Sequence, residues 1–182
     1  MVVVRAHKIS IRFEIRMVPS QARPKQSWHD LAGGSMPEMD WDTQGKQAMA
    51  GLEPLRFLIG RWAGAGVCHG ESVQGELEVT GILDGTWIQA RERLVNESGA
   101  EVHADVTFYR FDVEAESLQA IQLFEHGHMM LQPVEMTDDG FRWVTGPGGP
   151  QVFFLRHEDS ISYSVNLPGE AAAAVEMTYK RP

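Results

Sequence analysis

The chain has 182 residues, of which 43% are hydrophobic and 23% charged, and its net charge is −9. This composition is typical of one globular domain, and the negative charge argues against nucleic acid or an anionic membrane as the main partner. The single cysteine, Cys68, excludes an intramolecular disulfide and fits a reducing compartment. The sequence lacks an apolar run of about eighteen residues and the uninterrupted apolar core of a signal peptide, so we expect a cytoplasmic protein without a membrane span.

Residues 1–51 differ in chemistry from the rest of the chain. The first 35 residues carry six Lys/Arg and two Asp/Glu, a balance of +4, which leaves −13 on the remainder. Residues 1–18 alternate apolar and polar side chains, and they fit an additional strand, an organelle presequence or an extension upstream of the true start. The following stretch is rich in Pro, Gly, Ser and Gln, with one helical turn near residues 44–50. We predict that residues 1–51 are a poorly ordered extension and linker, and leave open whether residues 1–38 belong to the natural protein.

An apolar helical turn over residues 55–59 is followed by a glycine-rich strand. Gly60 marks the change, and Trp62 shares one face of the strand with Gly64 and Gly66. Glycine inside a strand marks a close backbone approach or a bend, and a large indole beside missing side chains suits a strand that curls to close a barrel. We therefore predict that Trp62 closes one end of a barrel against the turn at residues 55–59.

From residue 61 onward the chain alternates short strand patterns with turn signals such as Asp-Gly and Pro-Gly. About ten strands joined by short turns predict an antiparallel up-and-down barrel, because an open sheet of that size would leave an exposed edge. We expect the last strand to pair with the first, and the domain to cover residues 52–182. The predicted strands are residues 61–69, 72–83, 86–95, 102–112, 117–126, 128–137, 140–146, 150–157, 160–166 and 173–180.

The opening motif resembles that of a known superfamily. A helical turn followed by Gly60-Arg-Trp62 and Gly64-Ala-Gly66 is similar to the start of the calycin barrels, which include lipocalins and fatty-acid-binding proteins, and above all of the nitrobindin-type barrels. The resemblance implies an all-β barrel of about ten strands with a short capping helix. It also implies a lumen that holds a small apolar or amphipathic molecule.

Two predicted strands carry charged groups on a face that could line the lumen. In residues 86–95 these are Arg91 and Arg93, and in residues 102–112 they are His103 and Asp105, with Tyr109 on the same face. If the arginines face inward, they could bind a carboxylate in a bidentate way, as the internal arginines of fatty-acid-binding proteins do. If they face solvent, they have no role in binding. We take these five residues as the candidate ligand-binding set.

The sequence gives weak signals for metal or haem. His126 and His128 could share a strand face, but Gly127 predicts a turn between them, so we predict no metal site. Nitrobindin-type barrels hold haem through a histidine near the C-terminus, which the final strand lacks; Met177 and Tyr179 are the alternatives there. Histidines on other strands, His103 and His157, are further candidates, and we expect no haem or other cofactor.

These observations favour a barrel that binds a partly apolar small molecule, such as a fatty-acid-like carboxylate, without catalysis. Three alternatives stay open. One is an enzyme that uses His103, Asp105 and Tyr109 as acid–base groups, one is a haem-binding nitrobindin-like protein, and one is a barrel with a packed interior that serves as an interaction module. The sequence leaves the oligomeric state unassigned.

Overall fold

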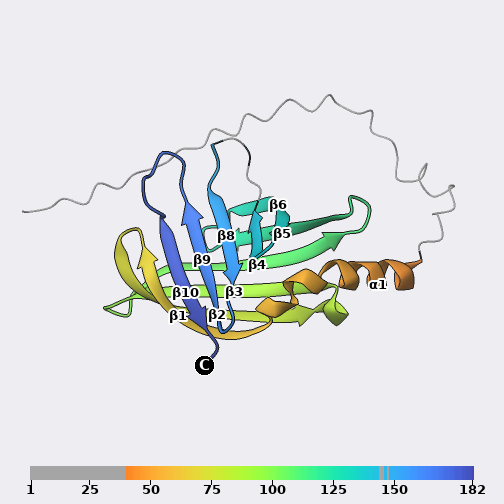
Figure 1. Ribbon diagram of the computed structural model, residues 1–182, viewed down its shortest axis with the longest axis horizontal. Helices are drawn as coiled ribbons and strands as arrows, with labels where there is room; N and C mark the ends of the chain where they lie inside the picture. The colour runs from red at the N-terminus through yellow and green to blue at the C-terminus, as the bar shows by residue number, and fades with distance from the viewer. Residues whose placement is uncertain (1–39, 144–145, 147) are drawn as a thin grey trace, which may run out of the picture. The chain divides into compact units, whose positions relative to one another are not determined.

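The computed structural model describes residues 40–143, 146 and 148–182, and residues 40–182 form one compact unit. Ten antiparallel strands close into a barrel in the order β1-β10-β9-β8-β7-β6-β5-β4-β3-β2 (Figure 1), which confirms the predicted fold class. The strands are β1 Gly60–Cys68, β2 Glu71–Ile82, β3 Trp87–Asn96, β4 Glu101–Asp112, β5 Ser117–Phe124, β6 Met129–Thr137, β7 Gly140–Trp143, β8 Gln151–Arg156, β9 Ser160–Asn166 and β10 Val175–Lys180. The helical elements are α1 Trp41–Gly51 and the 3₁₀ turns η1 Glu53–Leu58 and η2 Leu83–Gly85.

The barrel closes between the last strand and the first, as predicted. β1 pairs with β10, from the residue pair Ala63 and Lys180 to the pair Cys68 and Val175. The first and the last strand therefore each have a neighbour on both sides. The turn signals fall where chain reversals occur: Asp84 and Gly85 lie in η2, and Gly127 adopts φ 78° between β5 and β6. That turn shortens the two predicted strands on either side of it. The predicted turn at residues 147–150 lies partly outside the described residues.

The helix before the barrel is longer than the sequence suggested. α1 covers three turns within the stretch that we predicted as a linker, and it belongs to the same compact unit as the barrel. The Asp40 side chain caps it by accepting a hydrogen bond from the Thr43 backbone N–H at 3.1 Å. Its last residue, Gly51, lies against the Phe111 ring of β4, where a Cβ would be only 2.1 Å from the ring. The predictions for residues 1–38 lie outside the described residues.

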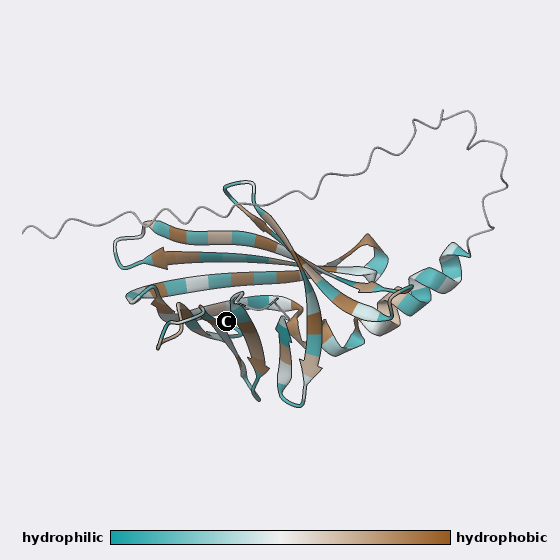
Figure 2. Ribbon diagram, turned by 90° about the horizontal axis from the view of Figure 1, so that it is seen from above, coloured by the Kyte–Doolittle hydropathy of each residue, from teal (hydrophilic) through white to brown (hydrophobic). Residues whose placement is uncertain are grey.

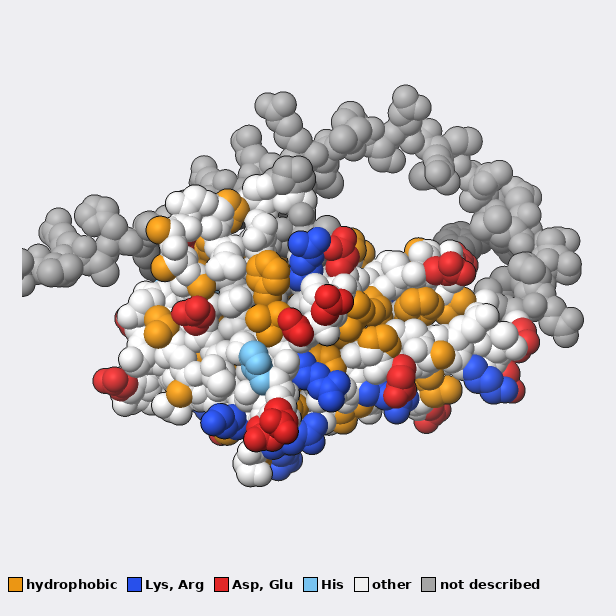
Figure 3. Space-filling view, in the orientation of Figure 1, with side chains coloured by type: hydrophobic (Ala, Val, Ile, Leu, Met, Phe, Trp, Pro, Cys, Tyr) orange, Lys and Arg blue, Asp and Glu red, His pale blue; other side chains and the backbone are white. Residues whose placement is uncertain are grey.

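Side chains alternate between the lumen and the outer face along each strand, which is visible as alternating hydropathy in Figure 2. The inward set forms the core, and it includes Trp62, Leu94, Phe141, Ile161 and Tyr179. On the face drawn in Figure 3, acidic and basic side chains are interspersed with apolar ones, so this face has no large patch of a single sign. Polar side chains that point into this apolar interior are therefore the candidates for a functional site.

The end of the barrel next to η1 is filled by Trp62. Its indole ring is 6% exposed, and Nε1 donates a hydrogen bond to the Leu58 carbonyl at 2.7 Å. The Arg181 guanidinium lies over the indole ring, 4.6 Å from its centroid, which is a cation–π contact. Gly60, with φ 143°, makes the bend between η1 and β1, a conformation that favours glycine.

The two strands that follow β10 on one side of the barrel, β1 and β2, carry glycines at inward-facing positions. Gly64 of β1 and Gly75 of β2 are direct neighbours in the sheet, and both face the lumen. A Cβ on Gly75 would lie 2.5 Å from the Met177 side chain and 2.7 Å from the Tyr179 hydroxyl. A Cβ on Gly66 would clash in the same way with the Met177 sulfur at 2.7 Å. The missing side chains make room for the long side chains of β10 to cross the interior.

Candidate functional site in the barrel lumen

A polar cluster lies inside the barrel on the neighbouring strands β3 and β4. Glu92 and Asp105 are direct cross-strand partners, and His103 precedes Asp105 by two residues, so all three side chains point inward. His103 Nε2 lies 3.1 Å from Asp105 Oδ2 and 3.8 Å from Glu92 Oε2. One imidazole thus contacts two carboxylates at the same ring nitrogen.

Two further strands complete the network. The Tyr179 hydroxyl, from β10, donates a hydrogen bond to Glu92 Oε1 at 2.5 Å. The Gln122 amide, from β5, donates to Asp105 Oδ2 at 2.5 Å. Glu92 therefore accepts a hydrogen bond from Tyr179, and Asp105 accepts one from Gln122 beside its contact with His103, so that these bonds hold the cluster in one arrangement.

Burial changes the acid–base properties of the cluster. Glu92 is 8% exposed, and its burial, together with the nearby charge of Asp105, raises its pKa to about 7. The hydrogen bond to Asp105 raises the pKa of His103 above its usual value, and the charges of both carboxylates add to this effect. Burial also raises the pKa of Tyr179, which keeps its hydroxyl protonated as a donor. The cluster can therefore share protons near neutral pH.

A cavity of about 310 Å³ opens onto this cluster at the end of the barrel opposite Trp62. Its walls are mostly apolar, and its polar lining includes His103, Gln122 and Tyr163. Trp143 also lines it, is 4% exposed, and has a buried Nε1 without a hydrogen-bond partner among the described residues. The apolar lining residues include Val102, Phe124, Met130, Val152 and Val165.

The five residues predicted to bind a ligand lie in three different places in the structure: at the cavity, in the core and on the outer surface. His103 lines the cavity, and Asp105 lies directly behind it. Tyr109 faces inward but is buried in the core, 1% exposed and edge-on to the Phe141 ring. The interpretation that Arg91 and Arg93 face the lumen is wrong, since both are exposed on the outer side of β3.

The reason lies in the alternation of β3. Glu92 and Leu94 point inward, so the residues between them must point outward. Arg93 forms an ion pair on the outer surface with Glu101, Nε to Oε2 at 2.7 Å. The predicted arginine clamp for a carboxylate is therefore absent from the described lumen.

Glu92 and Gln122 were not predicted as site residues, and Tyr179 was considered only as an axial ligand of haem. A signal for Glu92 existed, because it shares its strand face with Ile88, Ala90 and Leu94, and a lone carboxylate on an apolar face is unusual. Gln122 lies on a comparable inward face of β5.

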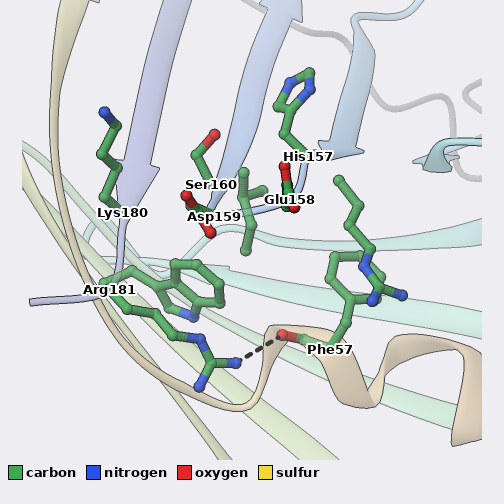
Figure 4. Close-up of a pocket in the computed structure, with 10 residues that line it drawn as sticks. Phe57, His157, Glu158, Asp159, Ser160, Lys180 and Arg181 are labelled. Carbon is green, nitrogen blue, oxygen red and sulfur yellow. Dashed lines mark hydrogen bonds between the residues drawn. The ribbon is translucent and has the colours of Figure 1, made fainter.

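The opposite end of the barrel carries a second hollow of about 450 Å³ (Figure 4). It lies beside Trp62 and is lined by side chains of both signs, among them Glu158, Asp159, Lys180 and Arg181. Arg181 donates a hydrogen bond to the Phe57 carbonyl at 3.3 Å, the contact drawn in Figure 4. Arg181 thereby ties the C-terminal residues to η1, and the hollow lacks the buried acid–base groups of the lumen cavity.

The other histidines considered as ligands lie on the outside. His126 is exposed and contacts the neighbouring Glu125, Nε2 to Oε1 at 3.1 Å. His128 is also exposed, with Gly127 turning the chain between the two. His157 is exposed, and its Nε2 lies 2.8 Å from Ser162 Oγ. Among the described residues, three His, Asp or Glu side chains converge closely enough for a metal at Glu92, His103 and Asp105.

Comparison of the chain with protein-family models and with curated proteins gave no match. Within the described part of the chain, we find no helix with the length and apolar character needed to cross a membrane. The chemistry of the lumen is therefore the basis for assigning a function.

Proposed function

We propose that this protein is a small-molecule-binding barrel of the calycin type, with the ligand held in the lumen cavity next to His103. The cavity volume of about 310 Å³ carries the proposal, since it lies at the lower end of the range of about 300–1,000 Å³ that is usual for ligand pockets. Apolar walls with a few convergent polar groups are the usual composition of such pockets. The cytoplasmic location expected from the single cysteine stays a prediction.

The charge of the lumen selects the class of ligand. Glu92 and Asp105 are the buried charged side chains of the described residues, and the arginines that could have bound a carboxylate lie outside. Among the described residues, no lysine or arginine lines the cavity, and His103 already contacts the Asp105 carboxylate, so the cavity offers a carboxylate ligand no bidentate partner. We therefore propose a neutral, mostly apolar ligand with one hydrogen-bonding group that faces His103 and Gln122, in place of a fatty-acid-like carboxylate.

Native mass spectrometry of the freshly purified protein tests this proposal, because a retained ligand adds mass. A complementary test titrates the environment-sensitive probe 1-aminoanthracene, which is neutral at pH 7.5. Val165→Phe places a ring at the cavity wall and should weaken probe binding about tenfold or more. The matched control Val67→Phe makes the same change at an outward-facing position of β1, 40% exposed, and should leave binding unchanged. Equal binding by both variants, without a retained ligand, would reject the proposal.

Acid–base catalysis in the same cavity is a second candidate, favoured by the contact between His103 and Asp105 at the cavity lining. In such a reaction His103 would accept a proton from a carbon next to a carbonyl group and return it, so that no other reactant is needed. Incubation with small cyclic ketones in heavy water tests this directly. Deuterium incorporation next to the carbonyl, lost in His103→Ala, would support catalysis, whereas incorporation at the uncatalysed rate would reject it for these substrates.

A further inference from the structure

We propose that Glu92, His103 and Asp105 form a binding site for one divalent transition-metal ion at the end of the lumen cavity. The site goes beyond the proposed ligand binding, and it was not predicted from the sequence. Its three residues come from paired strands, so the backbone of the barrel fixes their relative positions.

The distances between the donor atoms suit a shared metal ion. One donor atom from each residue lies within 4.8 Å of the others. His103 Nε2 is 3.1 Å from Asp105 Oδ2 and 3.8 Å from Glu92 Oε2. Ligand bonds of about 2.0–2.2 Å place neighbouring donors of one ion roughly 3–4 Å apart. An ion between these atoms would therefore need small side-chain adjustments.

The charge balance of the interior also favours a cation. Two carboxylates are buried there, and no lysine or arginine is buried among the described residues. Buried carboxylates are costly unless they are paired or bind a metal. A divalent ion would take the place of the proton that Glu92 otherwise retains and would balance both carboxylates at once.

The hydrogen bonds around the cluster have the pattern of supporting contacts in metal sites. Tyr179 donates to Glu92 Oε1, which leaves Oε2 directed toward His103. Gln122 donates to Asp105 Oδ2 and fixes the orientation of that carboxylate. Such contacts orient metal ligands and tune their affinity for the ion.

An ion also needs an entry path and open coordination positions. The cavity reaches His103 and Gln122, so it supplies both. The buried Nε1 of Trp143, which lacks a partner among the described residues, belongs to a side chain that lines the same cavity.

The donor set indicates which metals fit. One imidazole nitrogen and two carboxylate oxygens suit Zn²⁺, Mn²⁺, Fe²⁺ and Co²⁺, while Mg²⁺ and Ca²⁺ prefer oxygen alone. We therefore expect first-row transition ions to bind in preference to Mg²⁺ and Ca²⁺.

The test uses the full chain after dialysis against EDTA, with calorimetric titration of Zn²⁺ and a parallel titration of Co²⁺ followed by its visible absorption. We expect one ion per chain, and a loss of affinity of about 100-fold or more in His103→Ala and Glu92→Gln. The matched control is His126→Ala, which removes an exposed histidine that also contacts a glutamate. It should bind as the unchanged protein does.

Two results would overturn the metal site: no saturable binding of either ion, or binding that persists in His103→Ala and disappears in His126→Ala. Circular dichroism checks that each variant is folded, and the Co²⁺ titration of the unchanged protein does not depend on any variant. Probe binding to the EDTA-treated protein separates the two proposals, because the cavity can bind the probe even if the metal site fails. A bound ion would occupy His103 Nε2 and thereby exclude that atom as the general base.

Discussion

Tyr179 of β10 donates a hydrogen bond to Glu92 of β3 across two intervening strands, at 2.5 Å. The phenol passes over the inner face of β1 and β2, where Gly64 and Gly75 lack side chains. The glycines of the opening motif and the buried carboxylate are therefore parts of one arrangement. The missing side chains let a tyrosine reach the cluster and hold one carboxylate oxygen.

We predict that Gly75→Ala destabilises the protein and disturbs the cluster. The added Cβ would lie 2.5 Å from Met177 Cε, 2.7 Å from the Tyr179 hydroxyl and 2.9 Å from Leu94 Cδ2. The ends of the methionine and leucine side chains can turn aside, whereas the hydroxyl is held by its hydrogen bond to Glu92 and must be displaced. Overpacking of this kind costs about 1–3 kcal/mol, which urea denaturation can measure. The matched control is Gly81→Ala on the same strand, where an added Cβ would meet its nearest neighbour only at 4.0 Å. Equal stability of the two variants would show that Tyr179 does not cross at this position.

The stability of the EDTA-treated protein should depend on pH through Glu92. Its pKa is raised from 4.5 to about 7 by burial and by the Asp105 charge, so the folded state holds a proton that the unfolded state releases. Stability is then highest at the acid side of this window and falls as pH rises from about 4.5 to 7, by an amount on the order of 3 kcal/mol. The raised pKa of His103 acts in the same direction, since its contribution is lost as pH rises through the folded value.

Thermal unfolding between about pH 4.5 and 7.5 measures this effect, with Glu92→Gln as the test variant. The amide oxygen of the substituted side chain can still accept the hydrogen bond of Tyr179, but the amide cannot ionise, so the decline with pH should become shallower. Glu76→Gln removes an exposed carboxylate from β2 as the control. A decline in Glu92→Gln as steep as in the unchanged protein would refute the assignment.

The strands could be predicted from the sequence because Asp-Gly and similar turns punctuate the chain, and each turn fixes where a strand ends. The direction of the β3 side chains was left open, although the apolar neighbours of Glu92 were a signal, because both faces of that strand carry charge: Arg91 and Arg93 on one, Glu92 on the other. The contact between Glu92 and Tyr179 could not be predicted from the sequence either. It joins residues 87 positions apart and depends on closure of the barrel and on the register of the strands β10, β1, β2 and β3.

Trp62→Ala should cost about 3–5 kcal/mol of the free energy of unfolding, the usual range for a buried aromatic side chain. The ring is 6% exposed, and its loss also leaves the Leu58 carbonyl without the indole donor. Trp41→Ala is the control, because Trp41 is 72% exposed and surface changes usually stay within about 0.5 kcal/mol. A cost below about 1 kcal/mol for Trp62→Ala would contradict its role in closing the barrel.

We predict that residues 1–39 can be deleted without loss of the fold, since their charge and composition differ from those of the barrel. The deletion should stop before Asp40, because this residue caps α1 through Thr43. The melting temperature should change little, and it is measured by thermal unfolding of both chains. A large decrease would mean that the deleted segment contributes to the stability of the barrel.

Finally, we predict that the protein does not bind haem as nitrobindin-type barrels do. Of the candidate axial ligands, His157 is exposed and contacts Ser162, while His103 faces the lumen with its Nε2 directed at Asp105. Met177 is a weak anchor by itself, and burial raises the pKa of Tyr179, which opposes the deprotonation that iron binding requires. Titration with haemin followed by absorption spectroscopy decides the matter, and we expect no saturable change. A sharp Soret band at one equivalent, lost in His103→Ala but kept in His157→Ala, would instead place haem in the lumen cavity and displace the Zn²⁺ proposal.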